Sequence, residues 1–181
     1  MKQALIVIDF VNDFVDDKGS LTCGAPAQKI DGNIAKIVKD YADKGEFIVI
    51  ANDAHKADDK YSPESGFFPA HCIKGTWGAE VYGKTLKALE KVSEKQKLTV
   101  EKQRYSAFCG TNLDLKLRER KVDTVCLTGV CTDICVLHAA IDAYNLGYKV
   151  RVLESAVASF DGEAHKFALK HMKNVLGAEV V

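Results

Sequence analysis

The chain has 181 residues, 47% of them apolar and 28% charged, which is typical of a folded soluble protein and excludes disordered, collagen-like and coiled-coil classes. Lysine plus arginine equals aspartate plus glutamate at 25 each, so the sequence lacks the basic excess of proteins that bind nucleic acids or anionic membranes. We therefore expect a small-molecule partner, no nucleic acid and no membrane.

The chain length and the N-terminus favour one domain in the cytoplasm. Domains usually hold about 100 to 150 residues, so we expect residues 1–181 to form a single domain. The first apolar run stops at Asp9, which makes it too short for a signal peptide or a membrane span. The six cysteines lack the spacing of a disulfide framework, so we expect free thiols.

Continuous aliphatic runs predict strands that are covered on both faces of a parallel sheet. The four strong runs, followed by two weaker candidates, are residues 4–8, 47–51, 124–128 and 150–153, then 99–101 and 178–181. Amphipathic segments lie between them. The alternation of strands and helices indicates an α/β fold, a three-layer α/β/α sandwich.

The three-and-four spacing of apolar residues predicts three longer helices. The first begins near Pro26 and ends before Gly45, the second covers residues 132–145, and the third covers residues 162–176 behind the N-cap Asp161. In the second and third helices, the apolar side chains that we expect to face the core are Ile134, Leu137, Ile141, Tyr144, Phe167, Ala168, Met172 and Val175.

A long loop at about residues 53–78 interrupts this alternation, and such a loop inside a compact domain is usually functional. The two histidines of this loop, with two of its carboxylates, form a mixed nitrogen and oxygen donor set that suits Zn²⁺, Mn²⁺ or Fe²⁺. These four candidates are Asp53, His55, Glu64 and His71. A solvated polar loop is the competing interpretation.

Three reactive side chains follow the ends of predicted strands, where ligands of open parallel sheets bind. Cys135 lies in the first turn of a helix, where backbone N–H groups favour a thiolate. Asp9 and Lys102 would supply a proton acceptor and a cation, and the N–H groups of Cys131 and Cys135 would bind an oxyanion. Singly, each has an ordinary explanation as a turn cap, a solvated lysine or an inert thiol. His138 is a rival base, although we expect it to point away from the strand ends.

Together these elements resemble the isochorismatase-like cysteine hydrolases, and within them the nicotinamidases (pyrazinamidases). The resemblance covers almost the whole chain, and the order and spacing of the elements are more specific than any single motif. The matching elements are Asp-Phe-Val-Asn-Asp-Phe at 9–14, Asp-Ala-His at 53–55, Glu64, Pro-Ala-His-Cys-Ile-Lys-Gly-Thr at 69–76, Lys102 and Gly-Val-Cys-Thr-Asp-Ile-Cys at 129–135.

The resemblance implies a six-stranded parallel sheet in a Rossmann-like order and a cis peptide before Cys131. The implied catalytic residues are Asp9, Lys102 and Cys135, with oxyanion-hole N–H groups from Cys131 and Cys135. The implied ligands of one divalent metal ion, zinc ahead of manganese or iron, are Asp53, His55, Glu64 and His71. The implied substrate-binding residues are Phe14, Leu21, Phe68 and Tyr105.

The implied activity is the hydrolysis of nicotinamide to nicotinate and ammonia through a thioester, a reaction of NAD salvage, with pyrazinamide as a second substrate. One alternative is a hydrolase of the same family that acts on another amide or carbamoyl compound. The other is a non-catalytic metal- or redox-binding protein. Whether the chain forms a homo-oligomer is left open.

Three details of the sequence carry further expectations. Cys131 stands where the family usually has alanine, so we expect a second thiol, sensitive to oxidation, beside the oxyanion hole. Some family members have histidine at the position of Glu64, which makes its ligand role the least secure of the four. Lys102 on an edge strand would lie two strands, about 10 Å, from Asp9, so we expect the chain beyond Glu101 to bend inward.

Overall fold

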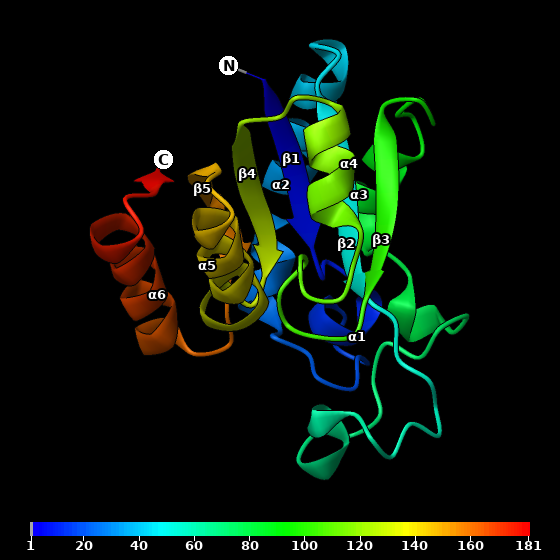
Figure 1. Ribbon diagram of the computed structural model, residues 1–181. Helices are drawn as coiled ribbons and strands as arrows, with labels where there is room; N and C mark the ends of the chain where they lie inside the picture. The colour runs from blue at the N-terminus through cyan, green and yellow to red at the C-terminus, as the bar shows by residue number, and fades with distance from the viewer. Residues whose placement is uncertain (1) are drawn as a thin grey trace.

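The computed structural model describes residues 2–181 and confirms the three-layer α/β/α sandwich (Figure 1). All five strand pairings in the sheet are parallel, in the order β3-β2-β1-β4-β5-β6. This is the predicted Rossmann-like order. The strands are β1 (Gln3–Ile8), β2 (Phe47–Asp53), β3 (Lys97–Lys102), β4 (Thr124–Val130), β5 (Lys149–Ala158) and β6 (Glu179–Val180).

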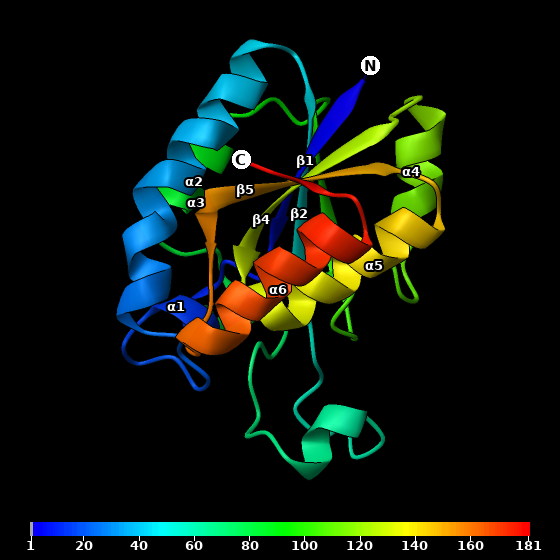
Figure 2. The same cartoon turned by 90° about the vertical axis from the view of Figure 1, so that its left-hand side faces the viewer.

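Helices cover both faces of the sheet, as Figure 2 shows for α2 on one side and α5 and α6 on the other. The first face is covered by α2 (Ala25–Asp43) and α3 (Gly83–Leu89). The opposite face is covered by α4 (Leu113–Glu119), α5 (Leu137–Asn145) and α6 (Gly162–Val175). The short helical segments are α1 (Asn12–Val15), η1 (Pro63–Gly66), η2 (Trp77–Ala79) and η3 (Thr132–Val136).

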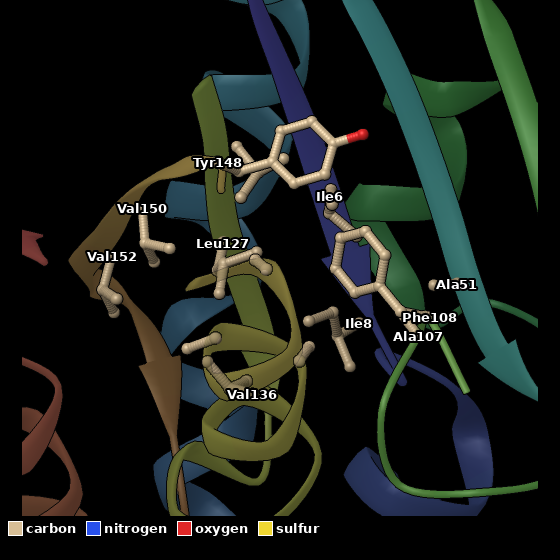
Figure 3. Packing of buried hydrophobic residues seen from close by; sticks show 14 of the residues in the cluster. Ile6, Ile8, Ala51, Ala107, Phe108, Leu127, Val136, Tyr148, Val150 and Val152 are labelled. Carbon is tan, nitrogen blue, oxygen red and sulfur yellow. The ribbon is translucent and has the colours of Figure 1, made fainter. Parts of the chain in front are cut away.

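The central strand β1 explains why its sequence is continuously apolar. Successive side chains of a strand point to opposite faces, so Ile6 and Ile8 join the core under α5 while Leu5 and Val7 join the core under α2. All four are fully buried. Figure 3 shows the first of these cores, in which Ile6 and Ile8 lie near Leu127 of β4. A strand buried on both faces has no polar face to alternate with.

Two predicted helix faces were wrong in part. In α5 the buried residues are Ala139, Ala140 and Ala143, whereas Tyr144 is 51% exposed. In α6 Phe167 and Val175 are 62% and 60% exposed, and the buried positions are Ala168, Leu169 and Met172. The small alanine side chains let α5 pack close to the sheet. A prediction from hydrophobic spacing favours the larger apolar side chains beside them, although these lie at the edge of the buried face.

The predicted starts of the first and third helices are confirmed, whereas the second, expected over residues 132–145, begins as the π-helical turn η3 and continues as α5 only from Leu137. Pro26 lies in the first turn of α2, and the Asp161 side chain accepts hydrogen bonds from the N–H groups of Glu163 and Ala164 at the start of α6. Gly45 follows α2 with a φ of 71°, a conformation that favours glycine. Among residues 2–181, no helix is both long and apolar enough to cross a membrane.

Candidate active site

Three reactive side chains meet at the carboxyl edge of the sheet. Asp9 follows β1, Lys102 is the last residue of β3, and Cys135 lies in η3 after β4. The Lys102 Nζ is 2.7 Å from Asp9 Oδ2 and 3.8 Å from Cys135 Sγ. Asp9, Lys102 and Cys135 are 0%, 1% and 6% exposed. The structure therefore brings the predicted trio into one buried cluster.

Lys102 reaches Asp9 through its side chain. It remains paired with Asp53 in the ladder between β2 and β3, so the inward bend that we expected after Glu101 is wrong at residue 102. The four methylene groups carry the ammonium across the end of β2, where it also lies 2.6 Å from Asp53 Oδ1. The chain turns only beyond Lys102. The Arg104 carbonyl then accepts a hydrogen bond from the Lys102 Nζ at 3.2 Å.

Burial and charge set the protonation of this cluster. Burial raises the pKa of Asp9 to about 7, with a further increase from the Asp53 carboxylate and an opposing effect of Lys102. Burial also raises the pKa of the Cys135 thiol, against the attraction of Lys102. Burial alone would lower the pKa of Lys102, but Asp9, Cys135 and Asp53 outweigh it and raise that pKa. The resting thiol therefore keeps its proton beside a carboxylate of unusually high proton affinity.

The turn between β4 and α5 presents backbone N–H groups beside the thiol. The Cys131 carbonyl accepts hydrogen bonds from Ile134 and Val136 at 3.1 and 3.2 Å, which holds the turn around Cys135. Within residues 2–181 the Cys131 N–H has no acceptor, so it is free to donate to a ligand. The peptide bond between Val130 and Cys131 is cis, as the resemblance implied.

A second buried group lies next to the first. Asp53, His55, Glu64 and His71 each place one ligand atom within 4.8 Å of the other three, and all four are buried. The His55 Nε2 is 3.8 Å from Asp53 Oδ2, and the His71 Nε2 is 3.5 Å from Glu64 Oε2. Tetrahedral ligands at about 2.1 Å from a zinc ion are about 3.4 Å apart, close to these separations.

The hydrogen bonding of the two histidines fits a cation. His55 Nε2 is buried and has no hydrogen-bond partner among the described residues, a costly state that a bound cation would relieve. His71 Nδ1 is 2.8 Å from the Pro69 carbonyl, which orients the ring and leaves Nε2 facing Glu64. Such a backbone contact is the usual support of a metal-binding histidine. The residues present therefore fit one divalent metal ion.

Asp13 connects the loop that carries His71 to the segment that carries Ser20. Its Oδ2 accepts a hydrogen bond from the Cys72 N–H at 2.6 Å, and its Oδ1 accepts one from the Ser20 N–H at 3.1 Å. At Gly78 an added Cβ would lie 2.1 Å from Asp13 Oδ2, so any larger residue there would displace the Asp13 carboxylate. We predicted no role for Asp13 from the sequence. Its two partners are backbone N–H groups, which every residue except proline has, and one of them is far away in the sequence.

A cavity of about 400 Å³ is lined by members of both groups, Cys135 from the first and Asp53, Glu64 and His71 from the second. All four predicted substrate-binding residues line it, namely Phe14, Leu21, Phe68 and Tyr105. Lining residues that the sequence interpretation did not single out for the pocket include Thr22, Ile134 and Phe160. They come from three separate segments, and no local pattern marked them.

The remaining histidine of interest lies outside this cluster. His138 is exposed, and its Nδ1 is 2.7 Å from the Ile134 carbonyl. Its ring packs beside Tyr105 with the ring centroids 5.2 Å apart. Among the described residues, the His138 ring thus has a backbone and an aromatic partner and no hydrogen bond with Cys135.

Comparison with known proteins gives a consistent result. The sequence matches the Isochorismatase domain over residues 3–181. The crystal structure of nicotinamidase/pyrazinamidase PncA from Bacillus subtilis is 49% identical with a TM-score of 0.98, over 100% of both chains. The pyrazinamidase/nicotinamidase from Streptococcus mutans is 51% identical with a TM-score of 0.97, over 99% of this chain and 100% of that one. The pyrazinamidase of Pyrococcus horikoshii in complex with zinc is 29% identical with a TM-score of 0.86, over 100% of this chain and 99% of that one. The chain therefore belongs to the isochorismatase family.

Proposed function

We propose that this protein is a nicotinamidase, which hydrolyses nicotinamide to nicotinate and ammonia and also accepts pyrazinamide. The observation that carries the proposal is a single cavity lined by Cys135 and by three metal-type ligands, Asp53, Glu64 and His71. The Lys102 ammonium lies 3.8 Å from the Cys135 sulfur and 2.7 Å from the Asp9 carboxylate. Relatives named nicotinamidase/pyrazinamidase, about half identical along the full chain, support the substrate. The reaction belongs to NAD salvage, which agrees with the expected cytoplasmic location.

Asp9, Lys102 and Cys135 carry the first half of the proposed reaction. Asp9 takes the proton of the Cys135 thiol, and the Lys102 ammonium stabilises the thiolate that forms. The sulfur attacks the carbonyl carbon of the amide. The N–H groups of Cys131 and Cys135 donate to the oxygen that becomes negatively charged.

Asp9 then moves protons in the second half. It delivers the proton to the departing nitrogen, so that ammonia leaves and a thioester with Cys135 remains. Asp9, again a carboxylate, accepts a proton from a water molecule that attacks the thioester carbon. Nicotinate leaves and the thiol is restored. A carboxylate whose pKa is raised to about 7 is suited to both transfers near neutral pH.

The opposite wall positions the ring. Phe14, Leu21, Phe68 and Tyr105 would enclose the ring and exclude water, while Asp53, His55, Glu64 and His71 would hold one divalent ion, which we propose is zinc. When bound, the ion supplies a positive charge that orients an electron-pair donor of the substrate. Zinc is supported by the donor set and by the related structure in complex with zinc, and manganese or iron would suit the same ligands.

Ammonia release with nicotinamide tests this proposal. We expect turnover by the native, metal-loaded protein, loss of most turnover after chelation with recovery on adding zinc, and none above background for Cys135→Ala. A panel that adds pyrazinamide and carbamoyl compounds tests the substrate class. Absence of ammonia from nicotinamide with metal-loaded native protein would refute the proposal, and faster hydrolysis of a carbamoyl compound would reassign the substrate.

A further inference from the structure

A second pair of thiols lies beside the cavity. The Sγ atoms of Cys23 and Cys131 are 3.0 Å apart, although the two residues are separated by 108 positions in the sequence. Cys131 is half-buried and lines the cavity at the end of β4. Cys23 lies behind it, 5% exposed, two residues before α2. Neither sulfur takes part in the proposed hydrolysis.

The backbone holds both residues of this pair in place. The Cys23 N–H donates to the Phe14 carbonyl at 2.8 Å, and the Cys131 carbonyl accepts from Ile134 and Val136. A disulfide has a sulfur–sulfur length of about 2.05 Å, so the two sulfurs need to approach by about 1 Å. Small side-chain rotations supply a movement of that size. The pair is therefore arranged to close without unfolding either segment.

The shared proton also prepares the pair for oxidation. The hydrogen bond from the Cys131 thiol lowers the pKa of Cys23, and the same bond, together with burial, raises the pKa of Cys131. When Cys23 loses its proton, its thiolate therefore lies in contact with the thiol of Cys131. The other cysteines differ, because burial raises the pKa values of Cys72 and Cys126 and neither has a sulfur partner among the described residues.

We propose that Cys23 and Cys131 form a reversible disulfide when the protein meets a peroxide. The thiolate of the pair attacks one peroxide oxygen, the O–O bond breaks, and a sulfenic acid and hydroxide form. The second sulfur then displaces the hydroxyl group from the sulfenic acid, and its proton completes a water molecule. The hydroxide takes up the proton that the first thiol released when it became a thiolate, which forms the second water. Two thiols are thus oxidised, and one hydrogen peroxide is reduced to two waters.

This disulfide would act on the cavity. Cys131 lines the cavity and supplies a proposed oxyanion donor, and Cys23 ends the segment that carries Leu21 and Thr22 on the cavity wall. A covalent bond between the two would draw Cys131 towards α2 and link these walls. The disulfide chemistry does not depend on the proposed function, whereas its effect on ammonia release does.

The bond is tested by mapping disulfides in full-length Cys135→Ala protein, which removes the reactive thiol of the proposed nucleophile. The protein is treated with hydrogen peroxide at a concentration equal to its own, blocked with N-ethylmaleimide and cleaved before aspartate. This cleavage leaves Cys23 and Cys131 in different peptides, 17–30 and 123–132. We expect a peptide pair joined through Cys23 and Cys131, with fragment ions that exclude Cys126. Cys131 recovered as alkylated thiol or sulfinic acid, without a link to Cys23, would overturn the proposal.

Matched variants separate this pair from other thiols. Cys23→Ser and Cys23→Ala, each confirmed as folded by thermal unfolding, should abolish the joined peptides, whereas replacement of the exposed Cys109 by serine should leave them unchanged. With Cys135 present, we expect peroxide to lower ammonia release at least fivefold and dithiothreitol to restore it. A different result would keep the bond but overturn its effect on the cavity. In that result mapping finds the link, yet peroxide lowers ammonia release by Cys23→Ser as much, and as reversibly, as it does for the native protein.

Discussion

The two walls of the cavity are built in different ways. On the wall with Cys135, the proposed catalytic groups lie at strand ends or in the turn that follows, and they are almost fully buried. On the other wall, Glu64 and His71 belong to the segment 54–82, which extends beyond the carboxyl ends of the strands (Figure 1). That segment contains short helical turns and two isolated bridges, one between His55 and Ile73 and one from Val81 to Val11. Asp53 alone contributes to both walls.

The two walls therefore differ in what holds their side chains in place: folding of the sheet for one, and binding of a ligand for the other. The sheet positions Asp9 and Lys102 when it forms, because their backbones belong to or directly follow paired strands. The loop depends on ties such as the Cys72–Asp13 hydrogen bond and, in our proposal, on a bound ion. We therefore expect changes at Lys102 to reduce both stability and chemistry, and changes in the loop to act mainly on binding.

The largest loss of activity is expected for Cys135→Ala. Without the sulfur no thioester forms, so kcat should fall by about 10⁴-fold or more, as for other nucleophile deletions. Binding of nicotinamide, measured by isothermal titration calorimetry, should change little because the cavity walls remain. Cys126→Ala, a buried thiol on the other side of the sheet, is the control and should keep its activity. Ammonia release by Cys135→Ala at a native rate would exclude the proposed nucleophile.

Lys102→Met should produce the largest loss of stability. It leaves Asp9 and Asp53 buried without their cation, and breaking a buried ion pair in this way typically costs about 3–5 kcal/mol. Urea unfolding measures this cost, and ammonia release should fall by about 10²-fold or more because the thiolate loses its counter-ion. Lys74→Met removes an exposed ion pair with Glu101 and should cost no more than about 1 kcal/mol. Equal unfolding midpoints for Lys102→Met and Lys74→Met would contradict the claim that the buried ammonium stabilises the fold.

His71→Ala should separate binding from stability. We expect loss of the bound metal, measured by elemental mass spectrometry, and a fall in kcat/KM of about 100-fold, since the substrate ring is no longer positioned. Its unfolding free energy should fall less than that of Lys102→Met. His171→Ala in α6 is the control and should retain the metal. A metal content unchanged in His71→Ala would remove this residue from the ligand set.

Asp13→Asn should have the smallest effect. The amide offers one acceptor where the carboxylate offered two, so either the Cys72 or the Ser20 N–H loses its partner, at a typical cost of about 1–3 kcal/mol. We expect a several-fold increase in KM with kcat nearly unchanged, because the segments that carry Cys72 and Ser20 shift while the catalytic trio does not. Asp17→Asn, an exposed carboxylate nearby, should match the native enzyme. An unchanged KM in Asp13→Asn would show that this tie does not position the loop.

Much of the fold could be predicted because its signals are local. Unbroken aliphatic runs such as residues 4–8 indicate strands that are buried on both faces, and Asp161 marks the start of α6 through its own hydrogen bonds. The helix faces were harder, since α5 packs through alanines and leaves Tyr144 exposed. Apolar spacing identifies a helix, but the depth of each side chain depends on how closely the neighbouring layer approaches.

The sequence alone determined the order of strands and helices, the reactive residue types at strand ends and the donor set in the loop between β2 and α3, because these depend on local pattern and on chemistry along the chain. Only the tertiary structure decided three contacts: the Lys102 side chain crosses β2 to reach Asp9, Asp13 accepts a hydrogen bond from Cys72, and Cys23 lies against Cys131. The physical reason is distance along the chain. Contacts between remote residues depend on sheet twist, side-chain reach and loop closure, and none of these leaves a repeating pattern in the sequence.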